Sequence, residues 1–194
     1  AVADRGKGKA SKRMTVKQLL DRVVSGDIEV WKLGEYMRDM SEEERKAVVK
    51  HFADIAKAKE FDADAQADYG HVLIQKLLNA PILEQGVLGT LADKQYDKAL
   101  KIDNEHWGAR FSKAMSLSNW PAMLGKQPEA MKHFNILIEQ QERKQPQPQF
   151  TQSYVVLGNL YSQQGKMEEA RKVWQRGLKR FPNDKTLRAR LELK

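Results

Sequence analysis

The sequence predicts an all-α protein built as a solenoid of helical hairpins. Apolar residues recur along most of the chain at the spacing of one helix face. No stretch alternates apolar and polar residues as a half-buried strand does. The last third also carries small, aromatic and turn-forming residues at spacings that recur, imperfectly, further upstream, which indicates a repeat array. A chain of 194 residues suffices for one compact domain or one short array.

The segment that precedes the repeats, residues 14–60, is predicted to be a helical N-terminal extension. Thr15 and Gln18 are spaced as a capping box, and Gly26 ends the apolar run that follows them. A second helix follows, and Ser41 with Glu44 forms another capping box that starts a third. The apolar positions that define these helices are Val16, Leu19, Leu20, Val23, Val24, Leu33, Tyr36, Met37, Met40, Val48, Phe52, Ile55 and Ala56.

Seven further helices are predicted by the same periodicity. They span roughly 62–78, 82–102, 105–118, 127–143, 152–163, 167–180 and 184–193. The last of these places Leu187 and Leu191 on one face and basic residues on the other, as expected of a helix that covers the end of an array. The region 61–194 is therefore expected to form the array itself.

One repeat unit, residues 151–184, has a specific pattern. Its positions are Tyr154, Leu157, Gly158, Tyr161, Gly165, Ala170, Trp174, Leu178 and Pro182. Small residues at Gly158 and Ala170 let two helices cross closely, Gly165 permits a tight turn, and Pro182 ends the second helix. The spacing resembles the tetratricopeptide repeat, with aromatic exchanges at two places. Gly177 departs from the family pattern and is expected to weaken its helix slightly.

Two earlier units resemble the same family less closely. Residues 107–144 keep the spacing in their second half but carry an insert over residues 118–124. Residues 62–104 are more degenerate, and the gap between Gly70 and Ala92 is longer than in the last unit. The resemblance covers roughly residues 62–194, and it implies hairpins that stack into a solenoid with the helix at 184–193 as its cap.

Nothing in the sequence predicts catalysis, a cofactor or a metal site. Cysteine is absent, and the four histidines form no pair at metal-binding spacing on a helix. Asp62, Asp64 and Asp68 lack the glycine and the distant glutamate of a calcium loop, so they are expected to mark the start of a helix instead. We therefore expect a non-enzymatic protein that binds another protein or a peptide.

The resemblance implies a partner-binding groove on the concave face, formed by the first helix of each unit. The positions that match are Phe111, Met115, Ser118, Gln152, Val155, Asn159 and Ser162. Phe111 and Val155 have the alternative of packing between units. Trp120, in the insert, either folds back on the array or projects as a contact for a partner. The basic groups needed to hold a peptide's terminal carboxylate are absent from the matched positions.

The charge distribution suggests an alternative function, the electrostatic binding of nucleic acid or of an anionic membrane surface. The chain carries 34 Lys and Arg against 26 Asp and Glu, a net charge of +8. The excess lies in the tail at residues 1–13, which is predicted to be disordered, and in the last quarter. The basic residues that would serve are Arg5, Lys7, Lys9, Lys12, Arg13, Lys172, Arg176, Lys179, Arg180, Arg188 and Arg190.

Two features argue against that alternative and leave the protein partner favoured. Acidic residues are interleaved among the C-terminal basic ones, and regularly spaced aromatic residues for base stacking are missing. No apolar run is long enough to span a membrane.

Assembly with further copies of the chain stays open. The start at Ala1, without methionine and within a basic linker-like tail, favours a bacterial periplasm or envelope setting over the cytoplasm.

Overall fold

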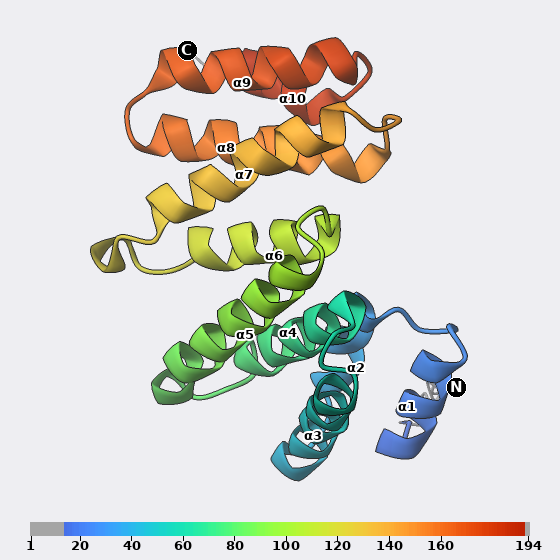
Figure 1. The fold of residues 1–194 in the computed structure, drawn as a ribbon. Coiled ribbons are helices and arrows are strands. Elements are labelled where there is room, and N and C mark those ends of the chain that lie inside the picture. Colours follow the sequence, from blue (N-terminus) through green and yellow to red (C-terminus); the bar gives the residue numbers. More distant parts are fainter. Residues whose placement is uncertain (1–13, 193–194) are drawn as a thin grey trace, which may run out of the picture.

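The computed structural model describes residues 14–192, and in this part the chain forms helices joined by short turns and no strand (Figure 1). The tail predicted at residues 1–13 lies outside the described residues. The α-helices are α1 (Val16–Val24), α2 (Leu33–Met37), α3 (Glu42–Ala58), α4 (Ala63–Leu77), α5 (Ile82–Ile102), α6 (Trp107–Ser118), α7 (Gln127–Glu142), α8 (Thr151–Gln163), α9 (Met167–Arg180) and α10 (Lys185–Leu191). Short 3-10 helices lie at Val30–Lys32, Ala122–Leu124 and Pro148–Phe150. The all-α prediction is confirmed.

Local sequence signals start and stop these helices where they were expected to. Thr15 and Ser41 both form complete capping boxes. The side chain of each cap residue accepts a hydrogen bond from the backbone N–H of the third helical residue, and the side chain of that third residue accepts one from the backbone N–H of the cap residue. Asp62 accepts from the Ala65 N–H at 3.1 Å, which makes it the N-cap of α4. Gly26 has a φ of 80°, a left-handed conformation that ends α1 at little steric cost.

The helices pair into successive hairpins that stack along the molecule (Figure 1). The hairpins are α4–α5, α6–α7 and α8–α9, and where one hairpin follows another its second helix packs against the first helix of the next. The helix α10 packs on α9 and also touches α8, where it covers the end of the array. At the other end, α3 packs on α4 as α5 packs on α6, and the short α2 also reaches α4.

The last hairpin is held by close packing around Gly158. A Cβ atom at Gly158 would come within 2.1 Å of Nε1 of Trp174, so only glycine lets the indole lie flat on α8. The indole N–H donates to the Val155 carbonyl at 3.4 Å, and Trp174 is buried. Trp174 therefore packs inside its own hairpin as well as filling the core. Gly165, with a φ of 74°, makes the turn between α8 and α9.

Gly177 has a packing role that helix propensity did not reveal. A Cβ atom there would come within 2.8 Å of Cβ of Tyr154 and 3.0 Å of Cδ1 of Leu187. The missing side chain thus lets α9 approach both α8 and α10. The sequence predicted that Gly177 weakens its helix slightly, and the structure adds this close packing.

The same arrangement recurs in the earlier hairpins. In α4–α5, Gly70 lies under the ring of Tyr96, and a Cβ atom at Gly70 would come within 2.6 Å of that ring. In α6–α7, Ala114 and Phe134 occupy the corresponding places, and both are fully buried. The degenerate units therefore keep a small residue on the first helix and a buried aromatic ring on the second at equivalent places.

Candidate protein-binding surface

The residues that the sequence analysis assigned to a concave groove lie on the first helices of two successive hairpins. Phe111, Met115 and Ser118 lie on α6, and Gln152, Val155, Asn159 and Ser162 lie on α8. We call these seven residues the first-helix face. Counted from Ala114 on α6 and from Gly158 on α8, the two sets occupy matching sequence positions. The matched pairs are Phe111 with Val155, Met115 with Asn159, and Ser118 with Ser162. The two small residues occupy equivalent places, so the two sets point the same way from helices in the same register.

The α6 members of the first-helix face are half-buried. Phe111 stacks on Trp107, with ring centroids 4.8 Å apart, and meets Phe134 edge-on. Met115 packs against the same core. The Ser118 hydroxyl donates to the Met115 carbonyl at 2.8 Å, so it is already used within α6. This part of the face offers an apolar surface.

The α8 members are more polar. Val155 is only 6% exposed and belongs to the core, so its side chain contributes little surface. Gln152 is exposed and Asn159 half-buried, and neither carboxamide hydrogen bonds to another residue of the described chain. The Ser162 hydroxyl is likewise unpaired within residues 14–192. Three polar groups on α8 are therefore available to a ligand.

Trp120, in the insert after α6, packs against the same core cluster as Phe111 and Met115. It folds back on the array, where its ring lies over Gly89 of α5 so closely that a Cβ atom there would meet it at 2.9 Å. Its indole also lies near the Asp93 carboxylate and lowers the pKa of that group, and the Ser116 hydroxyl donates to the same carboxylate at 2.8 Å. Burial nevertheless raises the pKa of Asp93 above its usual value. Of the two alternatives for Trp120, the structure has the packed one, while Met123 and Leu124 stay exposed.

A buried polar cluster between α5, α6 and α7 was not foreseen from the sequence. The Lys113 ammonium contacts the carboxylates of Asp97 and Glu129, and its side chain is only 6% exposed. Burial by itself would lower the pKa of Lys113, but the hydrogen bonds and charges of these two carboxylates raise it above the ordinary value. Arg110, also buried, donates to Nδ1 of His133 at 3.3 Å and to the Asn104 carbonyl at 2.6 Å. Lys113 of α6 thereby connects the α4–α5 hairpin with α7.

Several arginines of the electrostatic alternative have structural partners. Arg176 on α9 pairs with Glu142 on α7, and Arg180 donates to the Gln141 carbonyl at 3.1 Å. Arg188 donates to the Pro182 carbonyl at 2.9 Å. Because these contacts join α9 to α7 and fix the start of α10, the arginines are less available for phosphates than exposed lysines would be. Lys172 and Lys179 are exposed and unpaired in the described chain.

Among residues 14–192, no three His, Asp or Glu side chains gather as metal ligands. Within the same range, no helix is both long enough and apolar enough to cross a membrane. Two open pockets lie between helices, one of about 480 Å³ bounded by α3, α4 and α5, and one of about 500 Å³ bounded by α7 and the end of α8. None of the seven residues of the first-helix face lines either pocket, and no sequence pattern indicated them.

Comparisons with known proteins agree on the fold. A tetratricopeptide repeat family model matches residues 29–191, which includes α2 and α3 and so begins earlier than the resemblance seen in the sequence. A thermophilic TPR protein of Thermus thermophilus has a similar structure, with a TM-score of 0.62, 11% identity, and coverage of 91% of this chain and 87% of that one.

Two crystal structures of MamA are also similar, with TM-scores of 0.57 and 0.56 and identities of 14% and 15%. They cover 86% and 92% of this chain, and 86% and 85% of their own. A comparison with curated proteins finds no significant match. The family model spans most of the sequence and the stacked hairpins reproduce its architecture, so the chain belongs to the tetratricopeptide repeat family.

Proposed function

We propose that this protein is a non-enzymatic interaction module that binds a peptide or protein segment along the first-helix face. Tetratricopeptide repeat proteins generally mediate protein–protein interactions and are typically non-catalytic. Stacked hairpins leave an extended surface suited to a partner that spans several repeats. The first-helix face combines an apolar part on α6 with a polar part on α8. A peptide segment can pack its apolar side chains against the first part and form backbone hydrogen bonds with the second.

The observation that carries the proposal is the unpaired carboxamide of Asn159. A carboxamide both donates and accepts, so it matches one peptide unit of an extended segment without reading its side chains. Asn159 is half-buried and has no partner in the described chain. Gln152, two turns earlier on α8, is exposed and likewise unpaired within residues 14–192. The two side chains therefore support a ligand that runs along α8.

The test removes these amides and leaves the fold intact. The double variant Gln152→Ala/Asn159→Ala is expected to lose partners that the wild-type protein captures from lysate at about 0.15 M salt, with at least about tenfold weaker affinity for each partner measured directly. Gln175→Ala is the matched control, because Gln175 is an exposed and unpaired amide on α9 in the described chain. The thermal unfolding midpoint of each variant confirms folding.

A second pair of substitutions tests the electrostatic alternative. Lys172→Glu/Lys179→Glu reverses two exposed charges that form no hydrogen bond or ion pair within the described chain, so it spares the structural arginines. If binding is lost only in this variant and falls steeply with salt, the first-helix proposal is wrong and polyanion binding replaces it. Loss confined to the amide variant supports the proposal.

A further inference from the structure

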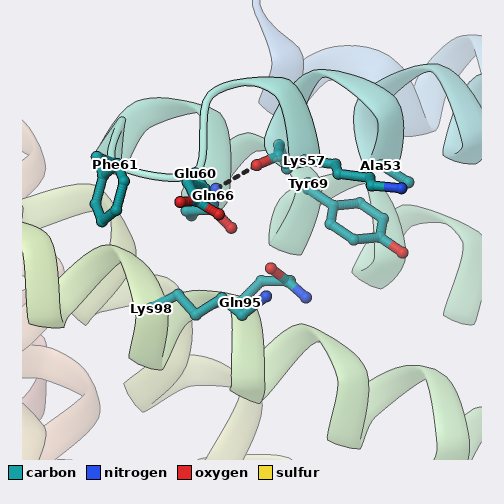
Figure 2. Close-up of a pocket in the computed structure, with 9 residues that line it drawn as sticks. Ala53, Lys57, Glu60, Phe61, Gln66, Tyr69, Gln95 and Lys98 are labelled. Atoms are coloured by element: carbon teal, nitrogen blue, oxygen red, sulfur yellow. Dashed lines mark hydrogen bonds between the residues drawn. The ribbon is translucent and has the colours of Figure 1, made fainter.

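The pocket bounded by α3, α4 and α5 belongs to a different part of the array from the first-helix face, which lies on α6 and α8. Its volume is about 480 Å³, within the range of ligand sites in proteins. Figure 2 shows Gln95 and Lys98 along one wall, on α5, with Gln66, Tyr69 and Lys57 across from them. Residues at the end of α3, together with Tyr69 of α4, give the pocket an apolar component.

The carboxamide of Gln95 is the unusual group in this pocket. Gln95 is 8% exposed, and its Oε1 atom is buried without a hydrogen-bond partner in the described chain. A buried polar atom left unpaired costs roughly 1–3 kcal/mol, so such atoms normally have a partner. Nearby Gln66 is satisfied in this way, because its amide donates to the Ala56 carbonyl at 2.7 Å. The unpaired Oε1 atom of Gln95 can accept a hydrogen bond, and no donor in the described chain supplies it.

The charges around the pocket indicate the sign of the missing ligand. Lys57 and Lys98 line it, and neither forms an ion pair in the described chain. Lys94 and Lys101 extend the row along α5 and are also unpaired there. Glu60 is the one acid among the lining residues. Among the lining residues, two ammonium groups without an ion pair in the described chain stand against one carboxylate, a balance that favours an anionic ligand.

The apolar groups indicate that the ligand also has a hydrophobic part. Phe61, at the edge of the pocket, is 82% exposed, which is unusual for a phenylalanine. Tyr69 presents a half-buried ring whose hydroxyl has no hydrogen bond in the described chain. Leu91 is one turn before Gln95 on the same side of α5 and is 36% exposed. Phe61 and Tyr69 thus give the pocket an apolar side, and Leu91 lies outside it on α5.

We propose that this pocket binds an extended acidic peptide segment that carries a large apolar side chain. The backbone N–H of such a segment supplies the donor for Gln95, its carboxylates meet Lys57 and Lys98, and its apolar side chain packs on Phe61 and Tyr69. A nucleic acid offers anions but no N–H along its backbone, and the basic tail of this chain has the wrong charge. The site is separate from the first-helix face and does not depend on the function proposed for that face.

The proposal is tested by selecting 12-residue peptides from a random display library on the full-length protein. The expected winners are rich in Asp and Glu around a Phe, Trp, Leu or Ile. Their affinity is expected to fall about tenfold or more in Lys98→Glu and in Gln95→Leu, because one variant reverses a contacting charge and the other removes the amide. Gln95→Glu, which keeps the shape, is expected to weaken acidic peptides to a similar degree.

Two control variants separate this site from the rest of the surface. Lys179→Glu makes the same charge change on α9, away from the pocket, and is expected to leave binding unchanged. Gln152→Ala/Asn159→Ala is likewise expected to leave it unchanged, so failure here and failure at the first-helix face are distinguishable. Thermal unfolding midpoints show that each variant is folded.

Three results would overturn the proposal. The first is a selection that yields no peptide, or only peptides without acidic residues. The second is a set of peptides whose binding is lost in the Gln152→Ala/Asn159→Ala variant but not in Lys98→Glu or Gln95→Leu. The third is displacement of the selected peptides by an oligothymidylate whose own binding is lost in Lys98→Glu, which would assign the pocket to nucleic acid.

Discussion

At the scale of single residues, burial gives several polar side chains properties that their chemistry alone does not imply. His133 is the clearest case. Burial, followed by the charges of Lys113 and Arg110, lowers its pKa to about 4. The geometry agrees, because Arg110 donates to Nδ1 of His133 at 3.3 Å, and that nitrogen accepts only while it carries no proton. His133 is therefore a neutral acceptor that helps to hold α6 and α7 together.

This neutral histidine predicts a loss of stability on mild acidification. Its pKa is lower in the folded than in the unfolded protein, so the unfolded state binds more protons as the pH falls from about 6.5 toward about 4. The free energy of unfolding is expected to decrease by about 2 kcal/mol between pH 7 and pH 5 through this group. Urea unfolding of wild-type protein and of His133→Gln at both pH values measures the effect.

The variant is chosen because glutamine still accepts from Arg110 but does not titrate. His133→Gln is expected to lose this part of the pH dependence, while the contributions of other groups, such as Asp93 with its raised pKa, stay the same in both proteins. Equal pH dependence in the two proteins would show that another group is responsible. The carboxylates with lowered pKa values, Glu42 and Glu142, act at lower pH and do not obscure the comparison.

At the scale of helices, the hairpin depends on a small residue beneath an aromatic ring. Gly158 under Trp174 and Gly70 under Tyr96 show the same contact in two hairpins. In both, the two helices approach so closely that a methyl group has no room. Polar contacts then connect one hairpin with the next, as Arg176 does from α9 to Glu142 of α7.

Two glycine-to-alanine substitutions test this packing against helix propensity. Gly158→Ala is expected to lower the free energy of unfolding by about 1–3 kcal/mol, because its Cβ atom would overlap the indole of Trp174. Gly86→Ala, on the exposed side of α5, is expected to raise it by about 0.5–1 kcal/mol, because a Cβ atom there meets nothing within 4 Å. Denaturant unfolding measures both, and stabilisation by both substitutions would contradict the close packing of α8 on α9.

At the scale of the whole molecule, the core of the described chain consists of three clusters that follow one another along the array. The largest contains residues of the α6–α7 and α8–α9 hairpins together with Leu187 of α10. A second fills the α4–α5 hairpin, and a third joins the N-terminal helices to Val72 of α4. In repeat proteins each unit is stabilised mainly by its neighbours, so stability follows the local size of the core.

Native-state hydrogen exchange is expected to report this gradient. The amides of α8 should exchange most slowly, because this helix packs against α7, α9 and α10. Those of α1 and α2 should exchange fastest, since α1 has one buried residue, Leu19, and α2 has little more than one turn. Mass spectrometry of peptides from each helix measures the rates, and equal protection of α1 and α8 would contradict the expectation.

The sequence by itself determined the helices and the family. Cap residues such as Thr15 and Ser41 form hydrogen bonds with backbone groups within one turn. The spacing of Gly158, Ala170 and Trp174 reflects the packing of two helices that are neighbours in the sequence. These signals are read correctly from sequence because the physical cause and its effect lie a few residues apart. The same pattern also identified the first helices of two hairpins, and with them the first-helix face.

Only the tertiary structure decided which residues of the first-helix face are exposed to solvent and which groups form hydrogen bonds or ion pairs with the buried polar side chains. Val155 lies in the core, Trp120 covers Gly89, Lys113 is buried between two carboxylates, and Gln95 lines a pocket with its oxygen unpaired in the described chain. Each of these facts depends on contacts between helices distant in the sequence. Burial, pKa and an unmet hydrogen bond are properties of that packing and not of any local stretch of sequence.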